Sequence, residues 1–369
     1  MPRRRFSLVF AILLALLRPT SEIALAQQPA AAARLGLEAI TMPTLAELGL
    51  ERAREPRVDP AVAEKSPCTG PEPRSRWAGR ESDDEWIPGL YPARERYGDG
   101  LLALTFDDGP HKTRTPIVLD ELARRGMTAT FFLTGHAIRS SSYHLVQRMV
   151  REGHTLANHG WRHDVKMAKQ VESLRELEAY VAAEFELTQI RVDLAMLASS
   201  AEDFTAIERE VFGRLSWVAH DREDQLRRMP RIRARHKALL ESRGYAEDRR
   251  PLTLEWARPP GGNPYLGKRW TTAEREAFAR AVNRQGLRMV MWNHGSGDSD
   301  TNLTPAQRRD PKRTAETARK AARRGGIYVA HDRIDPAALR AMLDAIGRPR
   351  LDVEVVSLER LWEIKLGCE

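Results

Sequence analysis

Cysteine is nearly absent from this chain, whose 369 residues include only Cys68 and Cys368. Two thiols are too few for a zinc cluster of thiolates, so any bound metal would have to be held by histidine and aspartate side chains. In an oxidising compartment the two cysteines would be able to pair, which would join the region before the globular part to the C-terminus.

A long apolar run is also missing. The stretch FSLVFAILLALL is too short to span a bilayer. It follows three consecutive arginines and precedes the small-residue site Ala24-Leu25-Ala26, so residues 1–26 are predicted to be a secretory signal peptide. The alternative is an uncleaved anchor, because Arg18 and Glu22 are unusual in such a flank. We therefore expect a secreted or periplasmic protein with no transmembrane segment in the mature chain.

Charge of one sign is not in large excess either. The formal net charge is +8, and the predicted signal segment holds four arginines and one glutamate, which leaves +5 for the mature chain. Such a mild excess slightly favours an anionic cell-surface polymer or a membrane face as a partner, although solubility alone explains it equally well. No nucleic-acid partner is predicted.

The chain divides into an N-terminal extension and one main domain. Residues 27–98 are rich in proline, alanine and charge, and we expect them to wrap the domain or link it to the envelope. From residue 99 to residue 369, short apolar runs alternate with helical patterns; the expected strands include LLALTF, TATFFLTG, HTLANH, LTLEWA, LRMVMW and IYVAH. This alternation predicts βαβ units and an α/β fold with a parallel sheet, in the form of a barrel of about seven or eight strand-helix units.

A charged helical stretch at about 165–250 interrupts the alternation. Two segments with helical apolar spacing are followed by the basic run RRMPRIRARHK. We expect a helical insertion beside the substrate groove that selects the substrate without supplying catalytic groups. Its basic run is predicted to meet an anionic polymer, with a solvated helix face or a partner-docking surface as alternatives.

Chemistry-bearing residues gather where the predicted strands end. LLALTFDDGPH runs as a buried strand into Asp107 and Asp108, whose side chains must point different ways, so that one is able to bind a metal and the other to act as a base. The alternative is an ordinary solvated Asp-Gly turn. Further on, His159 and His163 stand four residues apart, a spacing that brings two imidazoles together on one helical turn. One carboxylate and two imidazoles form the ligand set of a hydrolytic zinc.

These motifs carry a family resemblance. TFDDGP, NHGWRH, the arginine of RPPGG and the terminal AHD resemble the motifs of the polysaccharide deacetylases, the NodB-homology or carbohydrate esterase family 4 enzymes. The resemblance runs from about Leu101 to the C-terminus, outside the insertion. It implies a distorted (β/α) barrel of about seven strand-helix units and metal-dependent removal of acetyl groups from N-acetylglucosamine residues of a polysaccharide.

The resemblance also implies roles for individual residues. Carried over to this chain, the role of the base falls on Asp107 and that of the acid on His331. The metal ligands are Asp108, His159 and His163, and Arg258 orients the base. The metal is expected to be zinc, with cobalt or nickel as alternatives. An oxyanion donor is expected at the backbone N–H of Gly261, and substrate contacts are expected from Tyr265, Trp292, Trp161 and Asp298.

Two motifs depart from the family pattern. Gly261 and Gly262 stand where an aromatic residue usually follows the arginine motif, so one wall of the groove is missing or Tyr265 replaces it. The fourth motif, usually D-x-x-D-W, reads GSGDS around Asp298 and lacks its first aspartate and its tryptophan. This leaves open how His331 is tuned, with His294 or Asp300 as substitutes.

Two other functions compete with N-deacetylation. An O-acetyl esterase on an acetylated xylan-like polymer, or a hydrolase of a small cyclic amide, would use the same metal site. A carbohydrate-binding protein that has lost turnover is the third interpretation. The joint presence of base, ligands, arginine and acid favours catalysis.

The two cysteines lead to a direct prediction. We expect Cys68 and Cys368 to be disulfide-bonded in the mature protein, because secretion would expose both to an oxidising compartment. The chain-entropy model gives a stabilisation of about 4–5 kcal/mol as an upper bound for so long a loop. Thiol titration of the denatured, unreduced secreted protein is expected to find no free thiol, and two free thiols would contradict the pairing.

Overall fold

The structure of this chain is a computed structural model that describes residues 87, 89–91, 100–167, 173–213, 222–246, 249–266, 270–347 and 353–366. The predicted signal peptide, Cys68 and Cys368 lie outside these residues.

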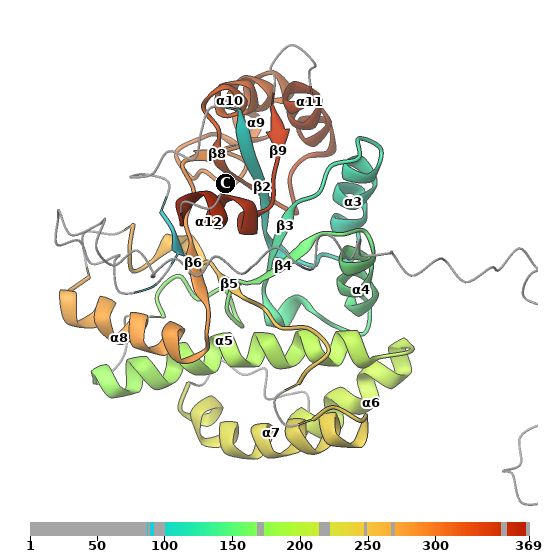
Figure 1. Ribbon diagram of the computed structural model, residues 1–369, viewed down its shortest axis with the longest axis vertical. Coiled ribbons are helices and arrows are strands. Elements are labelled where there is room, and N and C mark those ends of the chain that lie inside the picture. The colour runs from blue at the N-terminus through green and yellow to red at the C-terminus, as the bar shows by residue number, and fades with distance from the viewer. Residues whose placement is uncertain are drawn as a thin grey trace, which may run out of the picture. The chain divides into compact units, whose positions relative to one another are not determined.

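A single sheet of parallel strands organises the described part of the chain (Figure 1). The strands are β1 (Gly89–Leu90), β2 (Leu101–Gly109), β3 (Thr130–Leu133), β4 (Thr155–Asn158), β5 (Trp256–Ala257), β6 (Arg288–Val290), β7 (His294–Gly295), β8 (Gly326–His331) and β9 (Glu354–Val355). Their order is β1-β6-β5-β4-β3-β2-β8-β7, with β9 added beside the start of β2. The predicted α/β fold is confirmed, in the form of a curled sheet whose ends, β1 and β7, are not paired with each other among the described residues.

Helices pack around the sheet, most of them on its outer face. They are α3 (Thr115–Ala123), α4 (Tyr143–Arg151), α5 (Leu174–Leu197), α6 (Ala201–Phe212), α7 (Arg222–Ser242), α8 (Thr272–Arg284), α9 (Pro305–Arg308), α10 (Pro311–Arg324), α11 (Pro336–Ile346) and α12 (Leu358–Lys365), with short 3₁₀ turns η2 (Gly135–Ala137) and η4 (Pro260–Gly262). In Figure 1, α10 lies beside α11 at the top of the view, and α5 lies beside α8 at the bottom. Side chains alternate across each strand, so every second strand residue packs under these helices.

The inner face of the sheet forms a second apolar cluster. Seven strands each contribute one side chain to it: Leu90, Ala103, Phe132, Ala157, Trp256, Val290 and Ile327. Leu358 and Leu361 of α12 complete the cluster, and the Trp256 indole N–H donates to Glu359 Oε1 at 2.6 Å. Because Trp256 begins β5, α12 covers the ends at which the strands start. The opposite ends, where the strands finish, are left for the functional residues.

The N-terminal boundary of the domain needs a correction. We predicted that the domain begins at residue 99, after an extension from 27 to 98. The structure instead places Gly89 and Leu90 in the sheet, where they pair with Met289 and Val290 of β6. The sequence pattern missed β1 because two residues are too few to show alternation.

The stretch at about 165–250 is helical, but part of it belongs to the barrel itself. Helix α5 connects β4 toward β5, and its residues are largely buried, among them Leu177, Val181 and Phe185. It therefore serves as one of the covering helices, and α6 and α7 pack outside it. The predicted insertion therefore does not span the whole stretch, because α5 is part of the barrel.

Among the described residues, no helix has the length and apolar character needed to cross a membrane.

Candidate metal and catalytic site

The end of β2 separates two neighbouring carboxylates. The pairing of β2 with β3 shifts register between Asp107 and Gly109, and Asp108 takes a left-handed backbone with φ 76°. Asp107 is buried, whereas Asp108 is partly exposed. The irregularity turns the two side chains to different partners, as we predicted from the alternation of a strand.

Arg258 holds Asp107 in place. Its Nη1 donates to Asp107 Oδ1 at 2.6 Å and to Thr105 Oγ1 at 2.9 Å, and its Nε donates to the carbonyl of Val290 at 3.1 Å. The guanidinium is fully buried and lies 4.0 Å from the centre of the Phe132 ring. A buried cation bonded to one carboxylate oxygen keeps that carboxylate oriented.

The main chain of Arg258 also orients His159. The Nδ1 of His159 lies 2.7 Å from the Arg258 carbonyl oxygen. A carbonyl only accepts hydrogen bonds, so Nδ1 carries the proton and Nε2 presents its lone pair. That lone pair faces Asp108 Oδ1 at 3.5 Å and Asp107 Oδ2 at 3.7 Å.

His163 reaches the same point from a loop. We predicted that His159 and His163 share one helical turn, and this is wrong: the backbone from 159 to 164 is non-helical, with φ 74° at Gly160 and φ 57° at His163. The two left-handed residues fold the loop back, so that His163 Nε2 lies 3.1 Å from Asp108 Oδ1. The predicted proximity therefore exists, with a different backbone cause.

The three side chains fit a divalent cation. One ligand atom from each of Asp108, His159 and His163 lies within 4.8 Å of the others. Asp108 Oδ1 is buried and makes no hydrogen bond to any described residue, although it faces two imidazole nitrogens. Burial raises the pKa of Asp108, but the two histidines lower it well below its usual range, so its charge persists. A divalent cation held by this oxygen and the two imidazole nitrogens would give the buried oxygen a partner in place of protons on the rings.

Backbone strain coincides with these ligands. Among the described non-glycine residues, those with positive φ are Asp108 and His163. Such conformations cost about 1–3 kcal/mol each and persist where the surroundings require them. Both fall on predicted metal ligands.

His331 sits at the end of β8 beside Asp107. The two residues are register partners in neighbouring parallel strands, so their side chains share a face. His331 Nδ1 lies 2.9 Å from Asp298 Oδ1, and its backbone N–H donates to Asp298 Oδ2 at 2.9 Å. Burial lowers the pKa of His331, but the Asp298 hydrogen bond and charge, with smaller effects from Asp107 and Asp108, raise it to about 9.

The altered fourth motif is thereby accounted for. Asp298 itself binds the histidine, and Ser296 Oγ donates to Asp298 Oδ1 at 2.6 Å. Neither expected substitute takes this place: His294 Nε2 lies 3.2 Å from the carbonyl of Gly325, and Asp300 accepts from the Asn302 backbone. The prediction that His294 or Asp300 replaces the missing aspartate of this motif is therefore wrong.

The residues predicted to contact the oxyanion or the substrate differ in their solvent exposure. Gly261 is exposed in the turn after Arg258, with φ 61°. Trp292 is half-buried, 5.4 Å from the Arg258 guanidinium. Tyr265 packs on Phe278 of α8 at 5.8 Å between ring centres. Trp161 is 1% exposed and stacks on Arg191, so the prediction that it contacts sugar is wrong.

Two residues with a place in the site were missed. Thr105 stands two positions before Asp107 on the same strand face and accepts from Arg258; strand alternation was the signal that pointed to it. Asp332 follows His331 within the motif AHD, is fully buried, and accepts from the His111 N–H at 2.9 Å and from the Thr115 hydroxyl. Its own N–H donates to the Asp107 carbonyl at 3.1 Å, so it ties the turn after Asp108 to β8.

Comparison with known proteins finds similarity over part of the chain. The family model described as polysaccharide deacetylase matches residues 94–192. A chitooligosaccharide deacetylase from Bradyrhizobium sp. (strain ANU 289) is 45% identical over 83 residues, which are 21% of this chain and 37% of that protein. A peptidoglycan-N-acetylglucosamine deacetylase from Bacillus cereus is 44% identical over 63 residues, which are 17% of this chain and 29% of that protein.

The chain thus spans less than two fifths of the length of either relative. Among solved structures, the peptidoglycan deacetylase PdaC from Bacillus subtilis aligns over 73% of this chain and 94% of its own, with 19% identity and a TM-score of 0.42. The resemblance stated from the motifs is confirmed by the family match, which includes Asp107, Asp108, His159 and His163.

The geometry predicts how these residues divide the work of metal binding. Replacing His159 or His163 by alanine is expected to abolish tight zinc binding, because each supplies one of three ligands. Asp107→Asn is expected to leave zinc binding within about tenfold of the parent, because Asp107 Oδ1 bonds to Arg258 and Asp107 is not one of the three clustered ligand side chains. Calorimetric titration of the metal-free variants measures this. Loss of zinc in Asp107→Asn with retention in Asp108→Asn would reverse the assignment.

Proposed function

We propose that this chain, in which residues 94–192 belong to the polysaccharide deacetylase family, is a divalent-metal-dependent hydrolase. Its proposed reaction removes N-acetyl groups from N-acetylglucosamine residues of a polysaccharide. The observation that carries this proposal is one arrangement: a cluster of three metal-ligand side chains beside Asp107, which Arg258 holds, and His331, whose pKa is raised to about 9. Zinc suits two imidazoles and one carboxylate, with cobalt or nickel as alternatives.

Asp108, His159 and His163 would hold the metal. When bound there, a divalent cation would act as a Lewis acid toward the acetyl carbonyl and the attacking water. Asp107 then takes the proton of the water, because Arg258 occupies one of its oxygens and leaves the other free on the cluster side.

His331, the neighbour of Asp107 on strand β8, completes the reaction. The departing sugar amine needs a proton, and the Nε2 of His331 is the free ring nitrogen because Nδ1 is bound to Asp298. A pKa raised to about 9 keeps this imidazole protonated at neutral pH. The pair therefore holds one proton acceptor and one proton donor on the same face of the sheet.

The rim of the site suits an acetyl group and a sugar. The Gly261 N–H makes no hydrogen bond to another described residue, which leaves it available to an oxyanion. Val165 and Leu266 are exposed apolar residues beside this turn, and a side chain at Gly261 would meet Val165 at 3.3 Å. The glycine therefore keeps the approach to the arginine motif open.

Secretion forms part of the proposal. The predicted signal peptide would deliver the chain to the periplasm or the exterior, where acetylated polymers are found. An O-acetyl esterase on a xylan-like polymer remains the alternative reaction, because the same site would serve an ester. A non-catalytic binding protein is disfavoured, because the proton acceptor, the proton donor and their supporting bonds are all present.

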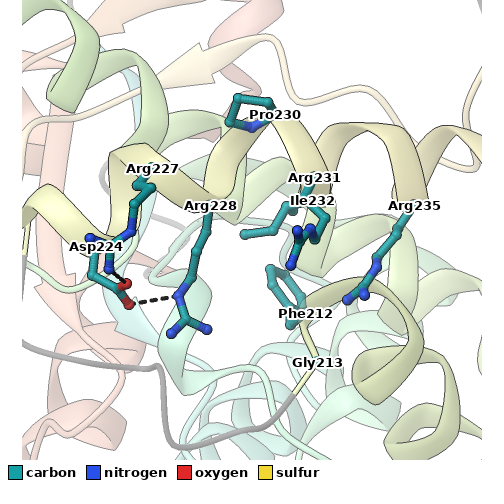
Figure 2. Close-up of a pocket in the computed structure, with 9 residues that line it drawn as sticks. All are labelled: Phe212, Gly213, Asp224, Arg227, Arg228, Pro230, Arg231, Ile232 and Arg235. Carbon is teal, nitrogen blue, oxygen red and sulfur yellow. Dashed lines mark hydrogen bonds and ion pairs between the residues drawn. The ribbon is translucent and has the colours of Figure 1, made fainter.

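A basic groove on the outer helices supports an anionic polymer as substrate. A hollow of about 710 Å³ lies between the end of α6 and α7. Figure 2 shows its arginine side chains around Phe212 and Ile232. Its lining residues are Phe212, Gly213, Asp224, Arg227, Arg228, Pro230, Arg231, Ile232 and Arg235. Asp224 pairs with Arg227 and Arg228, while Arg231 and Arg235 form no ion pair among the described residues. Two unpaired guanidinium groups suit the carboxylates of a peptidoglycan-type polymer better than neutral chitin.

The first prediction concerns the reaction itself. Acetate release from chitin oligomers, peptidoglycan and acetylxylan, measured in parallel with bound metal quantified, is expected to be greatest for an N-acetylated substrate. Asp107→Asn should reduce kcat by about 10²–10⁴-fold, because a general base contributes this much. Release confined to acetylxylan would select the esterase, and no release from any substrate by the metal-loaded protein would select a binding role.

The second prediction concerns pH. Because protonated His331 is the reactive form, kcat/KM is expected to fall as pH rises through its pKa of about 9. Asp298→Asn removes the negative charge that raises this pKa, so the alkaline limb should move down toward the ordinary histidine value near 6.5. Asp300→Asn is the matched control, since Asp300 bonds only within its own loop. An unmoved alkaline limb in Asp298→Asn would contradict the assignment of the acid.

The third prediction concerns the groove. The double reversal Arg231→Glu/Arg235→Glu is expected to weaken binding to peptidoglycan by about tenfold, since each exposed ion pair is worth up to about 1 kcal/mol. Turnover of a neutral chitin oligomer should not change. Lys320→Glu/Arg323→Glu on α10 provides a control of equal charge on another surface. Equal losses in the two double variants, measured by co-sedimentation, would show that only net charge matters.

A further inference from the structure

The loop that carries His159 and His163 rests on a buried carboxylate from α5. Glu184 is 0% exposed, and its Oε2 accepts the backbone N–H groups of Trp161 at 3.1 Å and Arg162 at 3.0 Å. These two residues lie between the histidines. The carboxylate thus fixes the peptide groups that connect one predicted ligand to the other.

The other oxygen of Glu184 is bound from two directions. Gln225 Nε2 of α7 donates to Oε1 at 3.1 Å, and Arg162 Nε lies 3.4 Å from the same atom. A buried carboxylate that accepts several hydrogen bonds is strongly oriented. A buried carboxylate without donors would lower the stability of the fold. Glu184 therefore joins the ligand loop, α5 and α7 in one hydrogen-bonded group.

Neighbouring side chains of α5 and α7 hold the far end of the loop. The Tyr180 hydroxyl, one turn before Glu184, donates to Asp164 Oδ2 at 3.2 Å. Arg222 of α7 lies over the Tyr180 ring at 4.0 Å and approaches Asp164 at 3.9 Å. Asp164 directly follows His163, so the loop is fixed on both sides of that ligand.

The backbone of this loop explains why such support is needed. Gly160 and His163 both adopt positive φ, and for His163 the conformation is strained. A β-carbon at position 160 would approach Glu184 Oε2 at 3.8 Å, which shows how closely the carboxylate follows the loop. Without Glu184, the N–H groups of Trp161 and Arg162 would lose the carboxylate oxygen that accepts both of them.

We propose that Glu184 is a positioning residue that sets the spacing of His159 and His163 and so determines the affinity and coordination geometry of the metal site. The proposal rests on the proposed metal-dependent function. It makes α5 and α7 supports of the metal site, in addition to the polymer binding proposed for the groove between α6 and α7. Outer partners of this kind typically change metal affinity by about 10–100-fold when they are removed.

Three variants and one surface control test the proposal. Glu184→Ala removes both acceptor oxygens. Glu184→Gln keeps an oxygen for the two loop N–H groups, provided that Gln225 turns its amide to present oxygen to the new NH₂ group. Gln225→Ala removes only the hydrogen bond that Glu184 accepts from α7. Glu186→Ala is the matched control, because it removes a carboxylate of the same helix that pairs at the surface with Arg233.

The measurements are cobalt and zinc affinity by chelator competition and the visible absorption spectrum of the cobalt-loaded protein. Glu184→Ala is expected to bind cobalt at least tenfold more weakly, with an altered spectrum. Glu184→Gln should recover most of the affinity, and Gln225→Ala should fall between the two. Glu186→Ala should match the parent in both measurements. Circular dichroism and thermal unfolding show whether each variant is folded.

Parent affinity and spectrum in folded Glu184→Ala would overturn the proposal. If Glu184→Ala does not fold, the decision passes to the other two variants, and parent behaviour in both would overturn it equally. A parent protein that binds cobalt but releases no acetate contradicts the proposed reaction while leaving the role of Glu184 intact. A parent protein that binds neither metal contradicts both.

Discussion

Arg258 is the residue on which the rest of the site depends. Its side chain bonds to Asp107, and its carbonyl oxygen fixes the tautomer of His159. One residue at the end of β5 therefore orients both a proton acceptor on β2 and a metal ligand after β4. Complete burial keeps water away from these hydrogen bonds and so strengthens them, while Nη2 has no hydrogen-bond partner among the described residues.

The backbone at the end of β2 gives two adjacent aspartates different roles. Asp107 is bound to a cation supplied by the protein, whereas Asp108 Oδ1 is left to the cluster of imidazoles. What divides them is a single irregularity at the end of β2, where Asp108 adopts a left-handed backbone. Asp332 secures the turn that follows, through His111 and Thr115. Strain at one ligand is thus balanced by buried hydrogen bonds one strand away.

Much of this arrangement was predictable because parallel strands end at one edge of a sheet. That rule brought Asp107 and His159 together before their contacts were known, and the family resemblance added Arg258 and His331. The reasoning failed where loops decide the geometry. His163 reaches the cluster through a left-handed loop, and four-residue spacing looks the same in a loop as in a helix.

Other features could not be predicted from the sequence pattern. Glu184 reads like any helix glutamate, because burial of a charged side chain depends on donors contributed by a distant loop and by α7. Asp298 was recognised, but its bond to His331 depends on how the loop after β7 folds, and the altered motif pointed instead to His294 and Asp300. β1 and α12 are short, and only tertiary packing against Trp256 and its neighbours gives them structure.

The central claim is that Asp108, and not Asp107, joins the two histidines at the metal. The most direct test is a crystal structure of the zinc-loaded protein with the ion located by anomalous scattering. The account predicts one ion within about 2.0–2.2 Å of Asp108, His159 and His163, with Asp107 still bonded to Arg258. An ion bound by Asp107 with Asp108 turned away, or an ion held elsewhere on the chain, would contradict it.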